Sequence, residues 1–318
     1  MKLENYTLEK FIQKGAFGDS YLTSIKDDPK KYLTKRLLRE EIEQDGIMNY
    51  FRNEIVILQH LNHPNIVKFK EVKKTKKYFY IIYEYYNGEN LHKALEKYMQ
   101  KFLKPFPEEI IQHFMKQIIN AIKYIHEKDI IHNELKPENI LLNYDNEEDK
   151  ENFNLMKANI KLIDFGFALK INNSENETKT NDIFSIGKIC YEMLIGKSAI
   201  YSEDMNQLLQ KIEDGSYTIP IMSREVVSFI NGMLHKDPKK RLTDEQLSKH
   251  DFLNKYVKEF HRLDFQNVPK NIDSKKLNDN EKDKKSVWSF FNPNVEALLS
   301  NIDGNEFIEP TIENEKEY

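Results

Sequence analysis

The side chains best suited to chemistry lie in the segment 132–139, which reads HNELKPEN in one-letter code. Glu134 carries a carboxylate that can accept a proton, Lys136 an ammonium that can pair with a phosphate, and Asn139 an amide oxygen that can ligate a hard cation. A further carboxylate, Asp164, follows the run IKLI and precedes Phe-Gly. These side-chain types indicate phosphate and metal chemistry, provided that the surrounding elements bring them together.

Two features near the N-terminus bear on the same chemistry but are ambiguous when taken alone. The segment 14–18 reads KGAFG, and glycines let backbone N–H groups approach a phosphate because no side chain intervenes. Two glycines in a small sheet are also typical of a simple hairpin turn. Lys35 lies in a strand-like pattern and Glu54 in a helical one, where each could be an ordinary solvated charge. Their order relative to the other motifs gives them meaning.

Hydrophobic periodicity divides the chain into a strand-rich first part and a helical second part. Over 6–86, short apolar alternations separated by turns predict a small sheet with one helix at 53–61. The segment 86–90 reads YNGEN, which is typical of a turn or hinge. Over 91–263 apolar residues recur at helical spacing. The clearest stripes are Ile110, Ile111, Phe114, Ile118, Ala121, Ile122 and Ile125, and then Ile186, Ile189, Cys190, Met193 and Leu194.

Length and composition limit the classes of protein that fit. A chain of 318 residues suits two lobes sharing a cleft, with some chain left over. The formal net charge of −4 argues against a basic nucleic-acid-binding surface. The single cysteine, Cys190, cannot form an internal disulfide, and the sequence shows neither an N-terminal apolar signal core nor an apolar run of membrane length. We therefore expect a cytoplasmic protein with no nucleic-acid partner and no membrane span.

Several motifs, taken in order over residues 6–263, resemble those of the protein-kinase family. The segment 132–139 resembles the catalytic loop H-R-D-L-x-x-x-N, and 160–166 ends in a full D-F-G motif. The others are the glycine loop at 14–18, Lys35 in the V-A-I-K position, LNHPNIV at 61–67, IIYEY at 81–85 and DIFSIG at 182–187. The resemblance implies an α+β, bilobal protein-kinase fold: a small β-rich N-lobe with one main helix and a larger, mostly helical C-lobe.

The same resemblance implies where the parts of the chain begin and end. The N-lobe is expected at 1–86 and the C-lobe at 87–264, with a shortened activation segment at 164–181. The remaining 265–318 is expected to be a charged tail whose Trp288 segment either packs back on the C-lobe or anchors a partner. Within the family, the chain looks most like protist autophagy-initiating, Unc-type kinases.

By the resemblance, the site binds ATP and magnesium. Lys35 and Glu54 would form the ion pair that orients the α and β phosphates, and Asn139 and Asp164 would ligate magnesium. The residues implied to contact the nucleotide are Gly15, Gly18, Lys35, Glu54, Glu84, Tyr86 and Leu141. Those implied to occupy the catalytic positions are Glu134, Lys136 and Asn139.

The departures from the family pattern fall on the side that handles a protein substrate. Glu134 replaces the catalytic Asp, and its extra methylene moves the carboxylate by about an ångström, a displacement that can lower a rate about 10²-fold. Asn133 replaces the Arg that clamps a phosphorylated activation loop. Only fifteen residues separate Gly166 from Asp182, about half the usual span, and no A-P-E motif is present. Arg241 therefore lacks its glutamate partner.

We expect a kinase-like ATP-binding protein with absent or very weak phosphoryl transfer, that is, a pseudokinase that binds or scaffolds protein partners. An active serine/threonine kinase using Glu134 is one alternative, because the metal ligands are retained. An incomplete gene model that lost the activation segment is another, although Asn133 and Glu134 lie outside that gap. A structural module without nucleotide is a third, because Leu33, a bulky gatekeeper at Tyr83, and Gln13 in place of the first loop glycine crowd the pocket.

Overall fold

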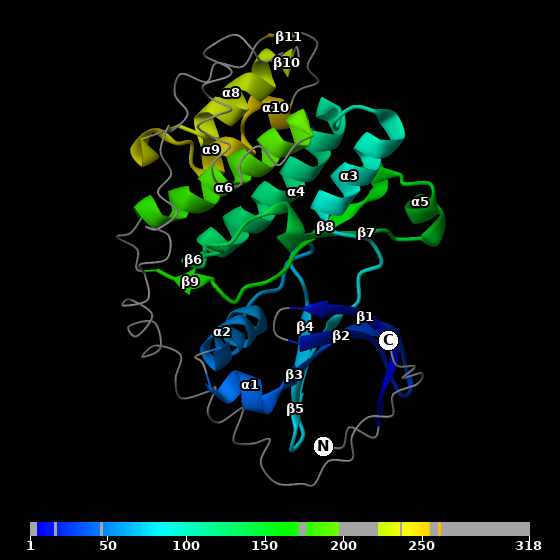
Figure 1. Ribbon diagram of the computed structural model, residues 1–318. Coiled ribbons are helices and arrows are strands. Elements are labelled where there is room, and N and C mark those ends of the chain that lie inside the picture. Colours follow the sequence, from blue (N-terminus) through cyan, green and yellow to red (C-terminus); the bar gives the residue numbers. More distant parts are fainter. Residues whose placement is uncertain are drawn as a thin grey trace.

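The protein consists of a sheet-based lobe and a larger helical lobe (Figure 1). The structure, a computed structural model, describes residues 5–15, 18–44, 47–171, 176–196, 222–235, 237–254 and 260–261. The α+β, bilobal architecture expected from the sequence is confirmed. The tail 265–318 with Trp288 lies outside the described residues, and so do Ala16 and Phe17 of the glycine loop.

The N-lobe sheet has five antiparallel strands in the order β1-β2-β3-β5-β4. The strands are β1 Tyr6–Gly15, β2 Gly18–Ile25, β3 Asp28–Leu38, β4 Phe69–Lys74 and β5 Tyr78–Glu84. Aromatic and β-branched residues suit β5, which pairs on both sides and is buried on both faces. Its residues alternate between faces: Tyr80 and Ile82 join a small cluster with Tyr6, whereas Ile81 and Tyr83 join the main core.

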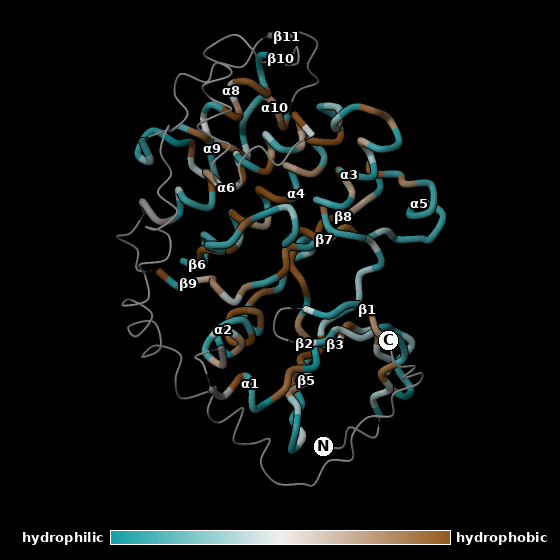
Figure 2. The backbone as a smooth tube through the Cα atoms, viewed as in Figure 1, coloured by the Kyte–Doolittle hydropathy of each residue, from teal (hydrophilic) through white to brown (hydrophobic). Residues whose placement is uncertain are grey.

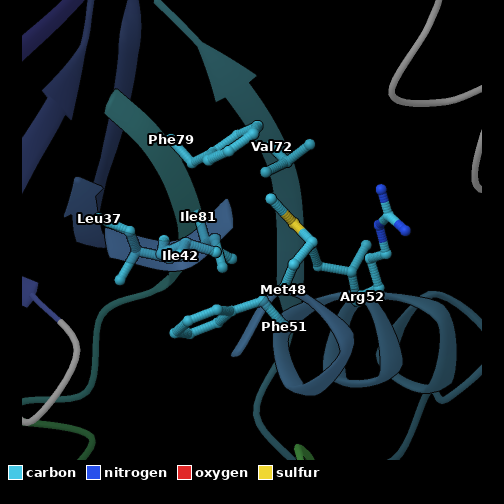
Figure 3. A pocket seen from close by; sticks show the side chains of 9 residues that line it. Leu37, Ile42, Met48, Phe51, Arg52, Val72, Phe79 and Ile81 are labelled. Atoms are coloured by element: carbon cyan, nitrogen blue, oxygen red, sulfur yellow. The ribbon is translucent and has the colours of Figure 1, made fainter. Parts of the chain in front are cut away.

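Helix α2, Ile47–Gln59, packs on one face of this sheet. Met48, Phe51 and Ile55 recur at helical spacing and line a small apolar pocket between α2, the sheet and the short helix α1, Arg39–Gln44 (Figure 3). The other lining residues are Leu37, Ile42, Arg52, Val72, Phe79 and Ile81.

The predicted bounds of this helix, 53–61, were wrong. The helix begins six residues earlier, at Ile47, because the apolar face extends back to Met48. It also ends earlier, because the N–H groups of His60 and Leu61 reach back only three residues, to Ile57 and Leu58, and so tighten the last turn.

Helix α4, Glu108–His126, forms the centre of the C-lobe. All seven residues of its predicted stripe are buried, and so are the five of the stripe on α6, Asn176–Ile195. Both predicted helices are therefore confirmed. The remaining helices are α3 Leu91–Phe102, α5 Glu147–Glu151, α8 Arg224–Met233, α9 Asp244–Ser248 and α10 Asp251–Asn254, with the 3-10 turns η2 Pro137–Asn139, η3 Leu155–Lys157 and η4 Pro238–Lys240.

Short strand pairs lie on the side of the C-lobe that faces the N-lobe (Figure 1). They are β6 Ile130–Ile131 with β9 Leu169–Lys170, and β7 Ile140–Asn143 with β8 Asn159–Leu162; a further pair joins β10 Met222–Ser223 to β11 Phe260–His261. Figure 2 shows hydrophobic stretches of α4, β7 and β8 in the middle of the molecule. A hydrophobic support therefore underlies the loops that follow these strands.

The expected hinge connects β5 to α3 without regular structure. The side chain of Asn90 caps α3 by accepting the N–H of Lys93 at 2.9 Å. The N–H of Gly88 donates to the carbonyl oxygen of Leu142 at 3.1 Å, which ties the hinge to β7. Among the helices that the structure describes, none combines the length and the hydrophobicity needed to cross a membrane.

Candidate functional site

The hairpin of β7 and β8 brings the two predicted metal ligands together. Its register pairs Ile140 with Leu162, and beyond that pair the N–H of Ile163 donates to the carbonyl oxygen of Asn139 at 2.9 Å. Asn139 ends the turn η2 just before β7, and Asp164 comes two residues after the end of β8. Both side chains therefore leave from the same end of the hairpin.

Each of these two side chains has one polar atom engaged and one oxygen remaining. Asn139 is 5% exposed and donates Nδ2 to the carbonyl oxygen of Glu134 at 3.0 Å, which orients its amide and leaves Oδ1 as an acceptor. Asp164 has a left-handed backbone, with φ of 66°, and its Oδ1 accepts a hydrogen bond from the Tyr50 hydroxyl. Oδ2 of Asp164 accepts no hydrogen bond from any residue that the structure describes.

The oxygens of Asn139 and Asp164 fit a magnesium ion. Magnesium prefers hard oxygen ligands and is usually held by one or two protein groups, with water and phosphate completing its coordination. The described ranges contain no group of three or more His, Cys, Asp or Glu side chains that could hold a metal by themselves. The donor set therefore suits a metal that is shared with a phosphate.

Glu134 and Lys136 face each other at the start of the same loop. The Lys136 ammonium lies 2.7 Å from Oε1 of Glu134, and each side chain keeps about a third of its surface exposed, 32% and 29% respectively. One of the two carboxylate oxygens of Glu134 is therefore engaged by a cation. The other oxygen accepts no hydrogen bond from the residues that the structure describes.

Lys35 on β3 and Glu54 on α2 form the expected ion pair, with Nζ 3.6 Å from Oε1. Glu54 is 1% exposed; burial raises its pKa, and the Lys35 ammonium opposes that rise. The ammonium also lies 5.3 Å from the centre of the Tyr83 ring, and burial, followed by the charge of Glu54, raises the pKa of Tyr83 well above its usual value. Lys35 itself is 31% exposed, which leaves its ammonium accessible to a ligand.

The predicted loop glycines close the hairpin of β1 and β2. Gly15 pairs with Gly18 across the turn. A Cβ at Gly18 would lie only 2.2 Å from the carbonyl oxygen of Arg36, on a backbone with φ of 151°. Glycine is therefore required at Gly18 by the close approach of β2 to β3, independently of any phosphate.

The remaining nucleotide-contact candidates lie along the hinge and β7. The Glu84 carboxylate lies 3.6 Å from the Lys30 ammonium and 3.7 Å from that of Lys68, so its side chain is already paired. The Tyr86 hydroxyl accepts the N–H of Lys68 at 3.1 Å, while the backbone N–H of Tyr86 donates to no described residue and is free for a base edge. Leu141 is partly buried on β7.

The backbone of the 132–139 loop is held by the buried carboxylate of Asp182 on α6. Its Oδ2 accepts the N–H of His132 at 2.8 Å, and its Oδ1 accepts that of Asn133 at 2.9 Å. Two carboxylates flank His126: Nε2 lies 3.0 Å from Asp182, and Nδ1 lies 3.0 Å from Asp244. Burial lowers the pKa of His126, but these hydrogen bonds outweigh it and raise the pKa above its usual value.

Two residues of α2, Tyr50 and Asn53, take part in the site although the sequence reasoning missed them. Burial and the neighbouring charge of Asp164 raise the pKa of the Tyr50 hydroxyl, which keeps it protonated as a donor to that carboxylate. Asn53 donates to backbone carbonyls just after Asp164. Asn53 and Glu54 follow Tyr50 by three and four residues, so helical geometry places each of them next to Tyr50 on the surface of α2. That spacing was the available signal.

Among the residues that the structure describes, Arg241 contacts carbonyl oxygens and an aromatic ring. Its Nε donates to the carbonyl oxygen of His235 at 3.0 Å, and its Nη1 donates to that of Thr180 at 2.9 Å. The guanidinium also lies 4.6 Å from the centre of the Phe184 ring. Arg241 thus anchors the first turns of α6 in the absence of an A-P-E glutamate.

The fold and the arrangement of Lys35, Glu54, Asn139 and Asp164 define a protein kinase domain. The chain belongs to the protein kinase family: the profile described as "Protein kinase domain" matches residues 6–181 and 173–253. Members of this family generally use ATP and Mg²⁺.

Curated proteins similar to the chain are kinases from several eukaryotes. It is similar to Aurora/IPL1-related protein kinase 2 of Caenorhabditis elegans, with 28% identity over 268 residues, covering 78% of this chain and 82% of the relative. Aurora kinase of Dictyostelium discoideum is 26% identical over 275 residues, 80% of this chain and 67% of that protein. Serine/threonine-protein kinase AtPK2/AtPK19 of Arabidopsis thaliana is 30% identical over 274 residues, 78% of this chain and 54% of that protein.

Proposed function

We propose that the chain binds ATP with magnesium between its lobes and transfers phosphate to proteins very weakly or not at all, acting as a pseudokinase in binding or scaffolding. One contrast carries the proposal. The residues that bind phosphate and metal in the family, Lys35, Glu54, Asn139 and Asp164, are retained, and Lys35 and Glu54 form an ion pair, whereas residue types that handle a protein substrate are altered or missing.

On the nucleotide side, each retained residue has a defined task. ATP with magnesium, when bound, supplies the phosphates and their transferable terminal group. Lys35, held by Glu54, pairs with the α and β phosphates, and the oxygens of Asn139 and Asp164 hold the metal. The free backbone N–H of Tyr86 offers a donor to the adenine edge.

On the substrate side, Glu134 is the altered base. Kinases depend on positioning more than on basicity, so a carboxylate displaced by one methylene loses much of its effect. The 2.7 Å ion pair with Lys136 further engages one of its two oxygens. Both features favour slow proton acceptance from a substrate hydroxyl.

The activation segment is the second altered part. Strand β9 ends at Lys170 and α6 begins at Asn176, which leaves five residues, 171–175, between them. The family profile matches in two pieces that overlap at 173–181, a pattern that suits a chain lacking family positions at this point. A docking surface for a substrate peptide has little chain from which to form.

The rival reading is an active serine/threonine kinase that uses Glu134. It is favoured by the intact Lys35–Glu54 ion pair and by the similarity to proteins named as kinases. A further rival is an incomplete gene model, which sequencing of the transcript across 171–181 tests directly.

A phosphorylation assay with radiolabelled ATP and a generic protein substrate tests the proposal. We expect labelling no greater than that of Lys35→Met, which removes the phosphate-binding cation. Strong labelling that Lys35→Met abolishes would overturn the pseudokinase assignment. In parallel, ATP with magnesium should raise the melting temperature, because a ligand that binds only the folded state stabilises it. No rise at millimolar ATP would remove the nucleotide from the proposal.

Finer assignments remain predictions from the sequence. They are the resemblance to Unc-type kinases, the cytoplasmic location, the boundaries at 86, 264 and 265, and the role of Trp288 as an intramolecular or partner anchor. A phylogenetic tree containing both Unc-type and Aurora kinases would decide the first, since the relatives described above are Aurora kinases and a plant kinase.

A further inference from the structure

We propose that Tyr50 and Asn53 of α2 position the Asp164 carboxylate and the backbone after it, so that the site takes up magnesium without a phosphorylated activation segment. The inference deepens the proposed binding of ATP with magnesium and rests on it. Both side chains are positioning residues, because Tyr50 contacts the Asp164 carboxylate and Asn53 contacts backbone carbonyl oxygens.

Tyr50 contacts Asp164 and two of the residues that follow it in the chain. Its hydroxyl donates to Oδ1 of Asp164, and its ring meets the Phe167 ring edge-on with the centres 5.0 Å apart. A Cβ at Gly166 would lie 2.0 Å from the Tyr50 ring, so the ring occupies space that only a glycine leaves open. A donor held in this way fixes the rotation of the carboxylate and directs Oδ2 to the metal.

Asn53 fixes the backbone that follows. Its Nδ2 lies 2.7 Å from the carbonyl oxygen of Ala168, 2.9 Å from that of Gly166 and 3.4 Å from that of Phe165. An amide nitrogen has two hydrogens, so the two shorter contacts are satisfied and the third is weak. One side chain of α2 thus holds the backbone after Asp164 at two points, one at the end of the D-F-G motif and one two residues beyond it.

Asn133, in the catalytic loop, completes this arrangement by donating Nδ2 to the carbonyl oxygen of Phe167 at 3.3 Å. The carbonyls of residues 165–168 therefore all lie within hydrogen-bond distance of an asparagine amide. Kinases commonly order this part of the chain by pairing a phosphorylated residue with arginine. Neutral amides bind carbonyl oxygens without any phosphate. Asn133, which stands where the family has an arginine, therefore still helps to hold this backbone.

The position of α2 couples these contacts to the phosphate-binding lysine. Glu54 pairs with Lys35 from the same face of the helix, 3.6 Å away, while the opposite face packs on the sheet around Met48 and Phe51 (Figure 3). A shift of α2 would therefore disturb Lys35 and Asp164 together. Magnesium and phosphate binding should depend on the same helix.

The test compares nucleotide affinity with and without magnesium in phosphatase-treated full-length protein. Competition against a fluorescent ATP analogue gives the dissociation constant of ATP in EDTA and in saturating Mg²⁺. The constant in EDTA divided by the constant in Mg²⁺ is the ratio that reports how much the metal strengthens binding. For Tyr50→Phe we expect this ratio to fall about 10-fold, the usual effect of losing a partner of a metal ligand, with the affinity in EDTA unchanged.

Tyr124→Phe is the matched control, because it also removes a hydroxyl, one that accepts the N–H of Asn62 at 2.9 Å. Its ratio should equal that of the wild type. An unchanged ratio in Tyr50→Phe would overturn the proposal, and so would a larger one, which would mean that Tyr50 competes with the metal. A wild-type ratio that collapses on phosphatase treatment would equally contradict it.

Hydrogen exchange separates failure of this inference from failure of the proposed function. In Asn53→Ala we expect the amides of residues 168–170 to exchange about 10-fold faster, because local opening becomes easier. Asn154→Ala is the control: it removes a side chain that donates a hydrogen bond to Asp149, away from the site, and it should leave the exchange rates of residues 168–170 unchanged. If the wild type binds no ATP, the proposed function fails, but the exchange measurement still decides whether α2 holds the backbone of residues 165–168. Unchanged exchange in Asn53→Ala would refute that α2 holds this backbone.

Discussion

The nucleotide-facing and substrate-facing parts of the site share one loop but are held in different ways. Lys35, Glu54 and Asp164 are joined to each other through α2, by contacts between residues far apart in the sequence. Glu134 instead pairs with Lys136, two residues away on the same loop. Binding of nucleotide therefore depends on the packing of the two lobes, whereas proton acceptance depends on the reach of one side chain.

This difference explains how one function can be lost while the other persists. The catalytic loop keeps its shape because Asp182 holds the backbone of His132 and Asn133, and backbone contacts do not depend on the side chains that changed. Substitution at Glu134 thus alters chemistry without disturbing Asn139, five residues later. The 132–139 loop therefore carries both the metal ligand Asn139 and the altered base Glu134, and one can change without the other.

Removing the support of this loop should have the largest effect. Asp182→Ala deletes the acceptor of two backbone N–H groups and one partner of His126. We expect the free energy of unfolding to fall by about 3 kcal/mol or more, because buried donors are left unsatisfied, and ATP-induced stabilisation to disappear as well. Denaturant unfolding with and without ATP measures both. Loss of only one of the two would contradict the idea of a shared support.

Removing the metal-binding charge should affect the nucleotide side alone. Asp164→Asn keeps the shape and an acceptor for Tyr50 but loses the negative charge. We expect the magnesium-dependent gain in ATP affinity to fall about 100-fold, with the affinity in EDTA and the melting temperature of the free protein nearly unchanged. Isothermal calorimetry in both conditions provides the measurement. Retention of the full magnesium effect would exclude Asp164 as the ligand.

Restoring the base should sharpen the contrast between the two sides. In Glu134→Asp we expect phosphoryl transfer to a generic substrate to rise less than 10-fold, because under the proposed function the short activation segment limits docking of a protein substrate. A competent kinase limited only by carboxylate position should gain about 10²-fold. Initial rates with radiolabelled ATP distinguish the two cases, with ATP affinity as the control that should not change.

The smallest effect expected is a pH dependence of the free energy of unfolding. It arises from His126, which contacts the carboxylate that holds the 132–139 loop, and not from a residue of the site itself. Because the folded-state pKa of His126 is raised by Asp182 and Asp244, its stabilising charge is fully present below its usual pKa of about 6.5 and is lost as pH rises through the raised value. The free energy of unfolding of the wild type should therefore decline as pH rises above about 6.5. His126→Gln should flatten this decline; an equal decline in the variant would assign it to other groups.

Local patterns predicted the helices and most of the site, whereas contacts across the lobes escaped them. The stripes of α4 and α6 follow from helical spacing, and Asn139 and Asp164 from short motifs. The sequence alone did not indicate that the Tyr50 hydroxyl would donate a hydrogen bond to Asp164, 114 residues later. That contact depends on how α2 packs against the sheet. The carbonyl oxygens that Arg241 contacts could not be predicted either, because they depend on how η4 packs against α6 within the C-lobe.

We propose that the protein binds ATP but does not transfer its terminal phosphate to a protein substrate. A single-turnover experiment tests both halves together: the protein is saturated with magnesium and radiolabelled ATP, and filter-retained ATP and labelled protein substrate are followed in the same sample. We predict that retained ATP persists while labelled substrate does not exceed that of Lys35→Met. Rapid loss of retained ATP with matching substrate labelling, absent in Lys35→Met, would contradict the account.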